Sequence, residues 1–428
     1  MQKRAQVARY KSRIAERASP TVLHLKAFYT VLGISMSVEQ VLDLAKKHER
    51  WRQNECLNLI PSENITSPTV RQLMISDMGH RYTSQDRYYA GTRYIDEMEM
   101  LGETLAKEVF KAEAANLRPI SGHMSDIILI STFAKPMEKV MTVHPLNGGY
   151  PGLSEEGLLR VLGLQGVYFP FDRQRMNIKV DESADLIKKV KPRIVVFGAS
   201  FFLFPHPVRE LMEVCRDNGI LVAYDGSHVL GLVAGGEFQN PFKDGVDILV
   251  GSTHKSFFGP QGGIILAKRE YGEQIAANVH PMLVDNAHWN RIAALTMALA
   301  EVKEFGRAYA RQVVKNAKAL AKSLDHSGLS VVGKEYGLTK SHQVILDAGG
   351  SKAGRDVARS LEKANMITDC GVRLGTCEVT RLGMKESEMK EIAEFIARIL
   401  LKNEKPQDVK RDVVKFRTQF EKIQFCFD

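Results

Sequence analysis

Cysteine is scarce in this sequence, with five among 428 residues. None of their spacings matches the paired ligands of a structural zinc site. An odd number of scattered cysteines also argues against the disulfide framework of a small secreted protein. We therefore expect a cytoplasmic protein in a reducing compartment, with no metal bound by the chain.

Long uncharged apolar runs are missing as well, and a membrane-spanning helix needs about 18 or more such residues. The start of the chain superficially imitates a signal peptide, because a basic stretch at 1–20 precedes an apolar stretch at 21–35. His24 and Lys26 interrupt the apolar stretch, and no convincing small-residue cleavage site follows it. We expect a soluble protein without a membrane partner.

Acidic residues are fewer than basic ones, 50 against 59, which gives a formal net charge of +9. Residues 1–20 contribute much of the excess. Such an arm could bind nucleic acid or an anionic membrane, although a solvated helical extension explains it more simply. The composition is otherwise that of a globular protein long enough for two or three domains.

Short apolar segments alternate with helical patterns through the middle of the chain, which is typical of βαβ units around a parallel sheet buried on both faces. The expected strands are 140–143, 194–200, 220–228, 246–250 and 264–266, and the expected helices between them include 184–190 and 208–217. A long helical pattern without proline, 292–324, then leads into a smaller region. That region is expected to contain strands at 329–332 and 344–346 and helices at 353–365 and 385–401. We predict an N-terminal arm with helices at 1–57, a large domain at 58–300 and a small C-terminal α+β domain at 301–428.

Residues 251–263 place one lysine, Lys255, on a loop between two of the expected strands. Small residues and glycines surround it, and Phe257 and Phe258 supply an apolar wall. A lysine confined in this way can lose part of its hydration and become a nucleophilic amine, which is suited to Schiff-base chemistry. Taken alone, an ordinary surface lysine at a strand end would be the better explanation of Lys255, and the second segment, upstream, changes that balance.

A second segment, residues 220–228, delivers Asp225 and His228 at the carboxyl end of another expected strand. Ligands bind at the carboxyl ends of strands in parallel α/β sheets. A carboxylate near a strand-end lysine suits pyridoxal phosphate, which needs a lysine for its Schiff base and an anionic partner for its pyridinium nitrogen.

These two segments resemble motifs of the serine hydroxymethyltransferase family. Residues 252–263 resemble its cofactor-lysine motif, and residues 224–232 resemble its aspartate motif. The resemblance extends from about Leu57 to the C-terminus in the same motif order. It implies a divergent fold-type I pyridoxal-phosphate enzyme that has a large, mainly parallel-sheet domain and works as a homodimer or dimer of dimers.

The resemblance also implies the cofactor ligands. Lys255 forms the Schiff base, Asp225 contacts the pyridine nitrogen, Ser200 faces the phenolic oxygen, and Tyr150 stacks on the ring where the family usually has a histidine. The implied set further includes His228, Thr253, His254, Gly262, Gly263 and, reaching a neighbouring subunit's cofactor, Tyr82.

A turn of Ser121, Gly122 and His123 is implied to hold the cofactor phosphate at a helix start. From the residues alone, a plain helix cap explains Ser121 and Gly122 more simply, although free backbone N–H groups there also suit an anion. His123 stands where the family usually has a small hydroxyl residue, and a cationic imidazole would still suit a phosphate.

Three residues are implied to contact an amino acid substrate. Ser62 belongs to a Ser-Glu-Asn signature, and Arg373 belongs to an Arg-x-Gly-Thr motif whose guanidinium fits a carboxylate in bidentate geometry. Tyr89 is implied to reach the substrate of a neighbouring subunit. Lys255, Asp225, His228 and Tyr89 are the expected catalytic residues, and no general base is assigned among the nearby histidines.

The chain departs from the family pattern in two short segments. The connection at 83–86 lacks a glutamate that assists proton transfer in the family, and Asp86 is the one acid there. The loop at 366–370 is shorter than the one that shapes the family's pterin pocket. Both shortenings fall in regions that serve the one-carbon carrier.

We therefore expect an enzyme that interconverts serine and glycine with tetrahydrofolate or another tetrahydropterin as carrier. A carrier-free aldolase or transaldolase for threonine-like β-hydroxy amino acids is the close alternative. A third possibility, from the basic arm, is a nucleic-acid-binding protein that retains a pyridoxal-phosphate fold.

Overall fold

The computed structural model describes residues 38–83 and 88–427. The chain separates into two compact units, residues 1–54 and 55–428. The described part of the first unit is helical, with α3 (Val38–Glu49) running into the π-helical η1 (Arg50–Glu55). The candidate site lies wholly within the second unit.

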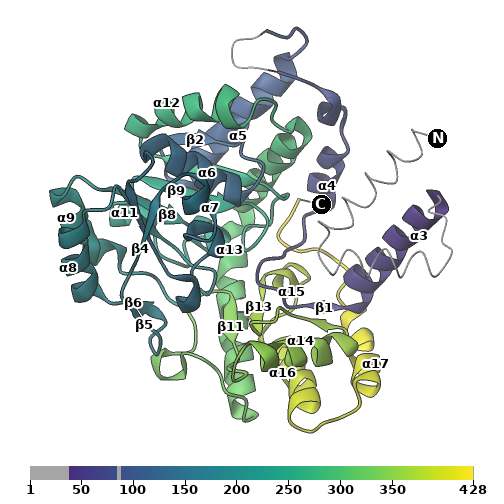
Figure 1. Cartoon of the computed structure of the whole chain (residues 1–428). Helices are drawn as coiled ribbons and strands as arrows, with labels where there is room; N and C mark the ends of the chain where they lie inside the picture. Colours follow the sequence, from purple (N-terminus) through teal and green to yellow (C-terminus); the bar gives the residue numbers. More distant parts are fainter. Residues whose placement is uncertain (1–37, 84–87, 428) are drawn as a thin grey trace, which may run out of the picture. The chain divides into compact units, whose positions relative to one another are not determined.

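A seven-stranded sheet organises the second unit (Figure 1), in the order β2-β10-β9-β8-β7-β3-β4. Strands β3, β4, β7, β8 and β9 are parallel, while β10 is antiparallel to its neighbours β2 and β9. The strands are β2 (Ala114–Asn116), β3 (Lys139–Thr142), β4 (Gln165–Tyr168), β7 (Ile194–Phe197), β8 (Leu221–Asp225), β9 (Ile248–Ser252) and β10 (Gly263–Ala267). The prediction of an α/β fold with a mainly parallel sheet is confirmed.

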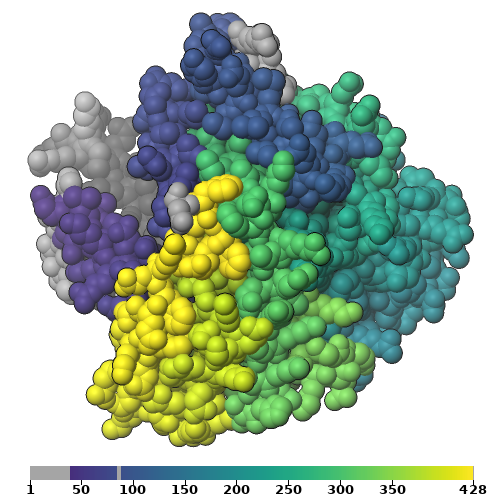
Figure 2. Space-filling model, turned by 180° about the vertical axis from the view of Figure 1, so that it is seen from behind, coloured from purple at the N-terminus to yellow at the C-terminus, as the bar shows by residue number. Residues whose placement is uncertain are grey.

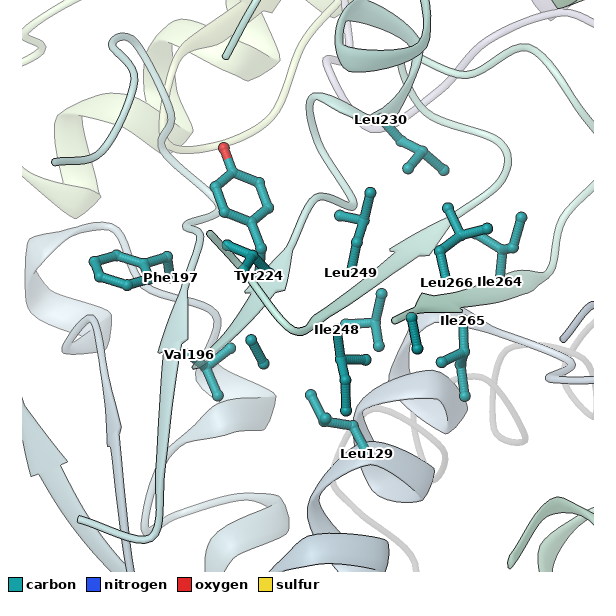
Figure 3. Packing of buried hydrophobic residues seen from close by; sticks show 14 of the residues in the cluster. Leu129, Val196, Phe197, Tyr224, Leu230, Ile248, Leu249, Ile264, Ile265 and Leu266 are labelled. Carbon is teal, nitrogen blue, oxygen red and sulfur yellow. The ribbon is translucent and has the colours of Figure 1, made fainter. Parts of the chain in front are cut away.

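Helices of this unit pack around the sheet and account for the complete burial of its central strands β7, β8, β9 and β10. They are α4 (Pro68–Met74), α5 (Arg93–Phe110), α6 (Gly122–Phe133), α7 (Leu158–Val161), α8 (Val180–Val190), α9 (Val208–Asp217), α10 (Leu230–Ala234), α11 (Pro241–Asp244) and α12 (Arg269–Ala277). Figure 3 shows Ile248 and Ile265 directed toward Leu129 of α6, whereas Leu249 and Leu266 lie on the opposite side of the sheet, as does Leu230 of α10. Because successive side chains of a strand alternate between faces, burial of both faces requires the continuous apolar runs seen in the sequence.

The long helix α13 (Trp289–His326) contributes to two hydrophobic cores. Its buried residues up to Val313 belong to the core of the large sheet, and those from Ala317 onward belong to a second core. The predicted domain boundary at residue 301 falls inside this helix, and the domain limits stay a prediction. Figure 2 shows the C-terminal segment lying along α13, where Phe425 packs on Tyr309 with ring centroids 5.6 Å apart.

The second core is built from small sheets and three helices. The strands are β1 (Leu57–Asn58) paired in parallel with β12 (Met366–Ile367), and β11 (Gln343–Ile345) antiparallel to β13 (Arg373–Gly375). The helices are α14 (Ser351–Lys363), α16 (Glu386–Leu400) and α17 (Pro406–Arg417), and the short α15 (Cys377–Arg381) follows β13. The strand expected at 329–332 is wrong, because only an isolated bridge between Val331 and Leu346 forms there. Among the described residues no helix is both long and apolar enough to span a bilayer.

Candidate active site

A cavity lies where β7, β8 and β9 end, beside the first turns of α6. It contains about 320 Å³ of space between atoms, including solvent at its mouth. Its lining residues are Gly122, His123, Asp126, Tyr150, Ala199, Ser200, Asp225, Ser227, His228, Ser252 and Lys255. The structure thus brings together seven of the residues predicted from sequence, Gly122, His123, Tyr150, Ser200, Asp225, His228 and Lys255.

The loop that carries Lys255 is fixed by hydrogen bonds at both ends. Thr253 donates from its hydroxyl to the Pro260 carbonyl at 2.7 Å, and its own carbonyl accepts the Gly259 N–H at 2.9 Å. The side-chain amide of Asn64 donates to the Lys255 carbonyl at 2.8 Å. These contacts hold the Lys255 backbone in place while its side chain reaches the cavity.

The environment of Lys255 makes its charged form less favourable than in water. Burial lowers the pKa of Lys255, the nearby carboxylates of Asp225 and Asp126 oppose that effect, and Arg373 adds to it. A lowered pKa leaves more of the amine unprotonated near neutral pH, which is the form that attacks a carbonyl carbon. Burial of Lys255 agrees with the sequence-based expectation of a partly desolvated lysine, and its role as a nucleophile stays a prediction.

Asp225 ends β8 and is 7% exposed. Its Oδ1 accepts the Ser227 N–H at 2.9 Å, so one oxygen is oriented by the backbone. The backbone of Gly198 lies so close to Asp225 that a Cβ on residue 198 would be 2.3 Å from the Asp225 carbonyl oxygen. The φ of Gly198, +126°, also favours glycine. The small residue after β7 is thus what lets two strand ends approach each other.

His228 lies in the cavity wall as a buried, neutral ring. Burial first, then the cations Lys255 and Arg373, set its pKa well below the usual range. The Gln343 side-chain amide lies 3.1 Å from His228 Nδ1, so Nδ1 accepts and Nε2 carries the proton. In this state His228 can donate a hydrogen bond at Nε2 but is poorly suited to accept a proton.

The start of α6 forms a cradle suited to an anion. Ser121 caps the helix, with its Oγ accepting the Met124 N–H at 3.0 Å, and its own hydroxyl proton stays available to a ligand. A Cβ at Gly122 would lie 2.1 Å from Ser252 Oγ, so the backbone could not come this close with any other residue. Ser227 and Ser252 supply hydroxyls beneath this turn, 3.2 Å apart. Unpaired N–H groups, hydroxyls and the helix N-terminus together match the chemistry of a phosphate.

Tyr150 and His123 form one side of the cavity. The Tyr150 hydroxyl lies 3.2 Å from His123 Nδ1, and the rings meet edge to face. Burial first, with the neighbouring acidic side chains adding to it, raises the pKa of Tyr150, so it remains a neutral phenol. Its ring thus offers a flat, uncharged face, as stacking on an aromatic cofactor requires.

Arg373 is held against the cavity wall by residues of both cores. Its Nε donates to Asp369 Oδ2 at 2.8 Å, its Nη1 donates to the Ser200 carbonyl at 2.5 Å, and its guanidinium lies over the Phe201 ring. Asp369 belongs to the shortened 366–370 loop, and its side chain also accepts the N–H groups of Gly371 and Arg373. The expected substrate arginine is therefore oriented by a carboxylate that the sequence did not single out.

Several predicted ligands lie outside the cavity lining. The hydroxyl of Thr253 is committed to the Pro260 carbonyl, and the Gly263 N–H donates to the Pro119 carbonyl at 2.9 Å. The others that do not line it are Ser62, Tyr82, Tyr89, Ser121, His254, Gly262 and Arg373. Burial lowers the pKa of His254 to about 4. Tyr82 and Tyr89 are 51% and 41% exposed, and the centroids of their rings are 5.5 Å apart. Asp86 lies outside the described residues.

Arg381, beside the substrate motif, has a structural role. It is fully buried, its Nη1 donates to the carbonyls of Gln424 and Phe425 at 2.6 Å, and its Nε donates to the Ile65 carbonyl at 3.3 Å. Its guanidinium also lies 4.1 Å from the centre of the Phe258 ring, on the loop of the cofactor lysine. This one side chain connects the lysine loop, the segment after Ser62 and the C-terminal segment.

Comparison with known proteins identifies relatives whose similarity extends over most of the chain. A model of the family described as serine hydroxymethyltransferase matches residues 34–396, a range that contains every cavity-lining residue. The chain is 44% identical over 390 residues to the serine hydroxymethyltransferase of Methanocella arvoryzae, covering 87% of this chain and 92% of the relative. It is 42% identical over 418 residues to that of Pyrococcus abyssi, covering 91% and 97%.

A solved structure shares the fold. The crystal structure of L-threonine transaldolase from Pseudomonas fluorescens in its internal aldimine state matches with a TM-score of 0.85 and 28% sequence identity, covering 96% of each chain.

Proposed function

The chain belongs to the serine hydroxymethyltransferase family, and from this premise we propose that it is a pyridoxal-phosphate enzyme interconverting serine and glycine with a tetrahydropterin, such as tetrahydrofolate, as one-carbon carrier. The observation that carries the proposal is one cavity that combines a desolvated lysine, a carboxylate at a strand end and an anion cradle at a helix start. Membership of an enzyme family also argues against the nucleic-acid-binding alternative.

The residues present fit the cofactor. Lys255 would bind its carbonyl carbon, Asp225 would face its ring nitrogen, Tyr150 would cover one ring face, and the start of α6 with Ser227 and Ser252 would hold its phosphate. When bound, pyridoxal phosphate supplies an electron sink that stabilises a carbanion at the substrate Cα. The anionic side chain of Asp225 strengthens that sink by keeping a proton on the ring nitrogen.

The other residues position the substrate and move protons. Arg373, already oriented by Asp369, would bind the substrate carboxylate, with Ser62 assisting. Lys255 Nζ, whose pKa burial lowers, would release its proton more readily than an exposed lysine does and so could exchange protons with an incoming amino group. His228 can hold an oxygen of the cofactor or substrate through Nε2.

A carrier-free aldolase or transaldolase is the second candidate, and two observations favour it. The matching solved structure is an L-threonine transaldolase, and both shortened segments fall where the family resemblance places the carrier. The distinguishing test measures glycine formed from serine with and without tetrahydrofolate, and glycine formed from threonine without it. Carrier-dependent serine turnover well above threonine cleavage supports the first function, and the reverse supports the second.

We propose that the enzyme acts as a cytoplasmic homodimer or larger assembly. Ile75, Tyr88, Tyr94, Met100 and Leu101 lie within one short stretch and are each more than half exposed, which is typical of an interaction surface. The free cysteines fit a reducing compartment.

A mixing experiment tests whether subunits share active sites, as expected if Tyr82 reaches a neighbouring cofactor. Lys255→Ala and Tyr82→Ala, each inactive alone, are unfolded, mixed and refolded. Recovered activity in the mixture supports a shared site. A mixture that sediments as a dimer but stays inactive contradicts it.

A further inference from the structure

Asp126 is a buried acid in the cavity that the proposed chemistry does not use. It lies on α6, one turn after Gly122, lines the cavity and is 1% exposed. Its Oδ1 has no hydrogen-bond partner among the described residues. Because buried polar atoms are nearly always paired, an unpaired carboxyl oxygen at a cavity wall indicates a partner supplied by a ligand.

The charges around Asp126 determine its protonation. Asp225 on β8 and Lys255 on the β9–β10 loop share the cavity with it, and the neutral groups Tyr150 and His228 complete the titratable lining together with His123. Two ionised carboxylates would face one lysine, so the set as a whole favours retaining one proton.

That proton belongs on Asp126. Oδ1 of Asp225 already accepts the Ser227 N–H, whereas Oδ1 of Asp126 accepts nothing. Burial first, then the charge of Asp225, raise the pKa of Asp126 well above its usual range, with Lys255 opposing. The two acids are chemically alike but differ in hydrogen bonding, which favours Asp126 as the holder of the retained proton.

We propose that Asp126 is a neutral carboxylic acid whose O–H donates a hydrogen bond to an oxygen of bound pyridoxal phosphate, which makes it a cofactor-binding residue. The inference rests on the proposed function, because it requires that cofactor. With Asp225 at the ring nitrogen, the acceptors that remain on pyridoxal phosphate are its phenolic and phosphate oxygens. A neutral acid can bind either oxygen without adding negative charge beside an anionic ligand.

The test compares Asp126→Asn, Asp126→Ala and an exposed control, Asp185→Ala, as cofactor-free proteins titrated with pyridoxal phosphate. Asparagine keeps an N–H donor, so we expect its dissociation constant within about threefold of the parent, whereas alanine should raise it about tenfold or more, equivalent to about 1.4 kcal/mol. The parent-minus-Asp126→Asn infrared difference spectrum at neutral pH should show a protonated carboxyl band.

The outcomes separate the two proposals. Failure of the parent to bind pyridoxal phosphate overturns the proposed function itself. A parent that binds while Asp126→Ala binds equally well, or while Asp126→Asn is as weak as alanine, overturns only the role of Asp126. If Asp126→Ala does not fold, the asparagine variant and the infrared band still decide, and absence of the band overturns the neutral acid.

Discussion

The two sides of the cavity are assembled differently. The cofactor side comes from the ends of strands in a single sheet and from the start of one helix. Its residues are joined by hydrogen bonds such as the one between Ser227 and Ser252. The substrate side depends on distant segments, because Arg373 of the second core reaches Ser200 and Gln343 reaches His228. The cofactor side should therefore form with the sheet, whereas the substrate side requires both cores to be packed together.

The largest effect should follow from removing the lysine of the cofactor side. Lys255→Ala should abolish the visible absorbance of bound pyridoxal phosphate and reduce turnover by at least about a thousandfold, or about 4 kcal/mol, because no other lysine lines the cavity among the described residues. Absorbance spectra and serine turnover provide the measurement. The exposed control Lys243→Ala should retain both, and a Lys255→Ala protein that also retained them would disprove the assignment.

Asp225→Ala should separate binding from chemistry on the same side. We expect pyridoxal phosphate to remain bound, while turnover falls about a hundredfold or more, equivalent to about 2.7 kcal/mol, because the ring nitrogen loses its anionic partner. The measurement is kcat on cofactor-saturated protein. Turnover within about tenfold of the parent would show that Asp225 does not serve the ring nitrogen.

A smaller effect is expected on the substrate side. Arg373→Lys keeps the charge but loses the planar fork that binds Asp369 and Ser200, so KM for serine should rise roughly tenfold. Affinity for pyridoxal phosphate should stay within about twofold. Arg175→Lys, at an exposed arginine, serves as the control. A variant that lost cofactor affinity as much as substrate affinity would show that the two sides are not separable.

The smallest effect concerns the histidine between the two sides. His342 is fully buried, donates to the Pro61 carbonyl and stacks on His228, and burial lowers its pKa to about 3. Between that value and the unfolded pKa of about 6.5, the unfolded chain binds the extra proton, so stability falls as pH falls. From pH 7 to 6 this single group should cost about 0.7 kcal/mol.

Urea unfolding of the cofactor-free protein at both pH values tests this. The side-chain amide of His342→Gln can still donate to the Pro61 carbonyl. Between pH 7 and 6 this variant should lose about 0.7 kcal/mol less stability than the parent. The exposed control His326→Gln should follow the parent. Equal pH dependence in the parent and His342→Gln would contradict a neutral His342.

The contrast between the two sides also explains what the sequence could predict. Lys255 and Asp225 follow uninterrupted apolar strands, so local pattern placed them correctly at one edge of the sheet. Asp126 left a usable signal, since it is the one acid in α6, four residues after Gly122 and directly before an apolar run. Ser227 and Ser252 were missed because a serine beside a motif carries no distinguishing pattern.

On the substrate side, local motifs marked Ser62 and Arg373 but not the residues that orient them. Asn64 and Gln343 reach the site through hydrogen bonds to residues far away in the sequence. Asp369 reaches it through Arg373, four residues later. The failed strand at 329–332 has the same cause, because an apolar run becomes a strand only where a partner extends alongside it.

The contacts of Arg381 have a consequence for biosynthesis. Its guanidinium binds the carbonyls of Gln424 and Phe425 while lying over Phe258, so the loop of the cofactor lysine rests on residues translated near the end of the described chain. On a ribosome, the sheet could begin to form long before those residues emerge. We therefore expect a nascent chain to gain the ability to capture pyridoxal phosphate only once Gln424 and Phe425 have emerged from the ribosome, even though most of the proposed cofactor ligands precede residue 256.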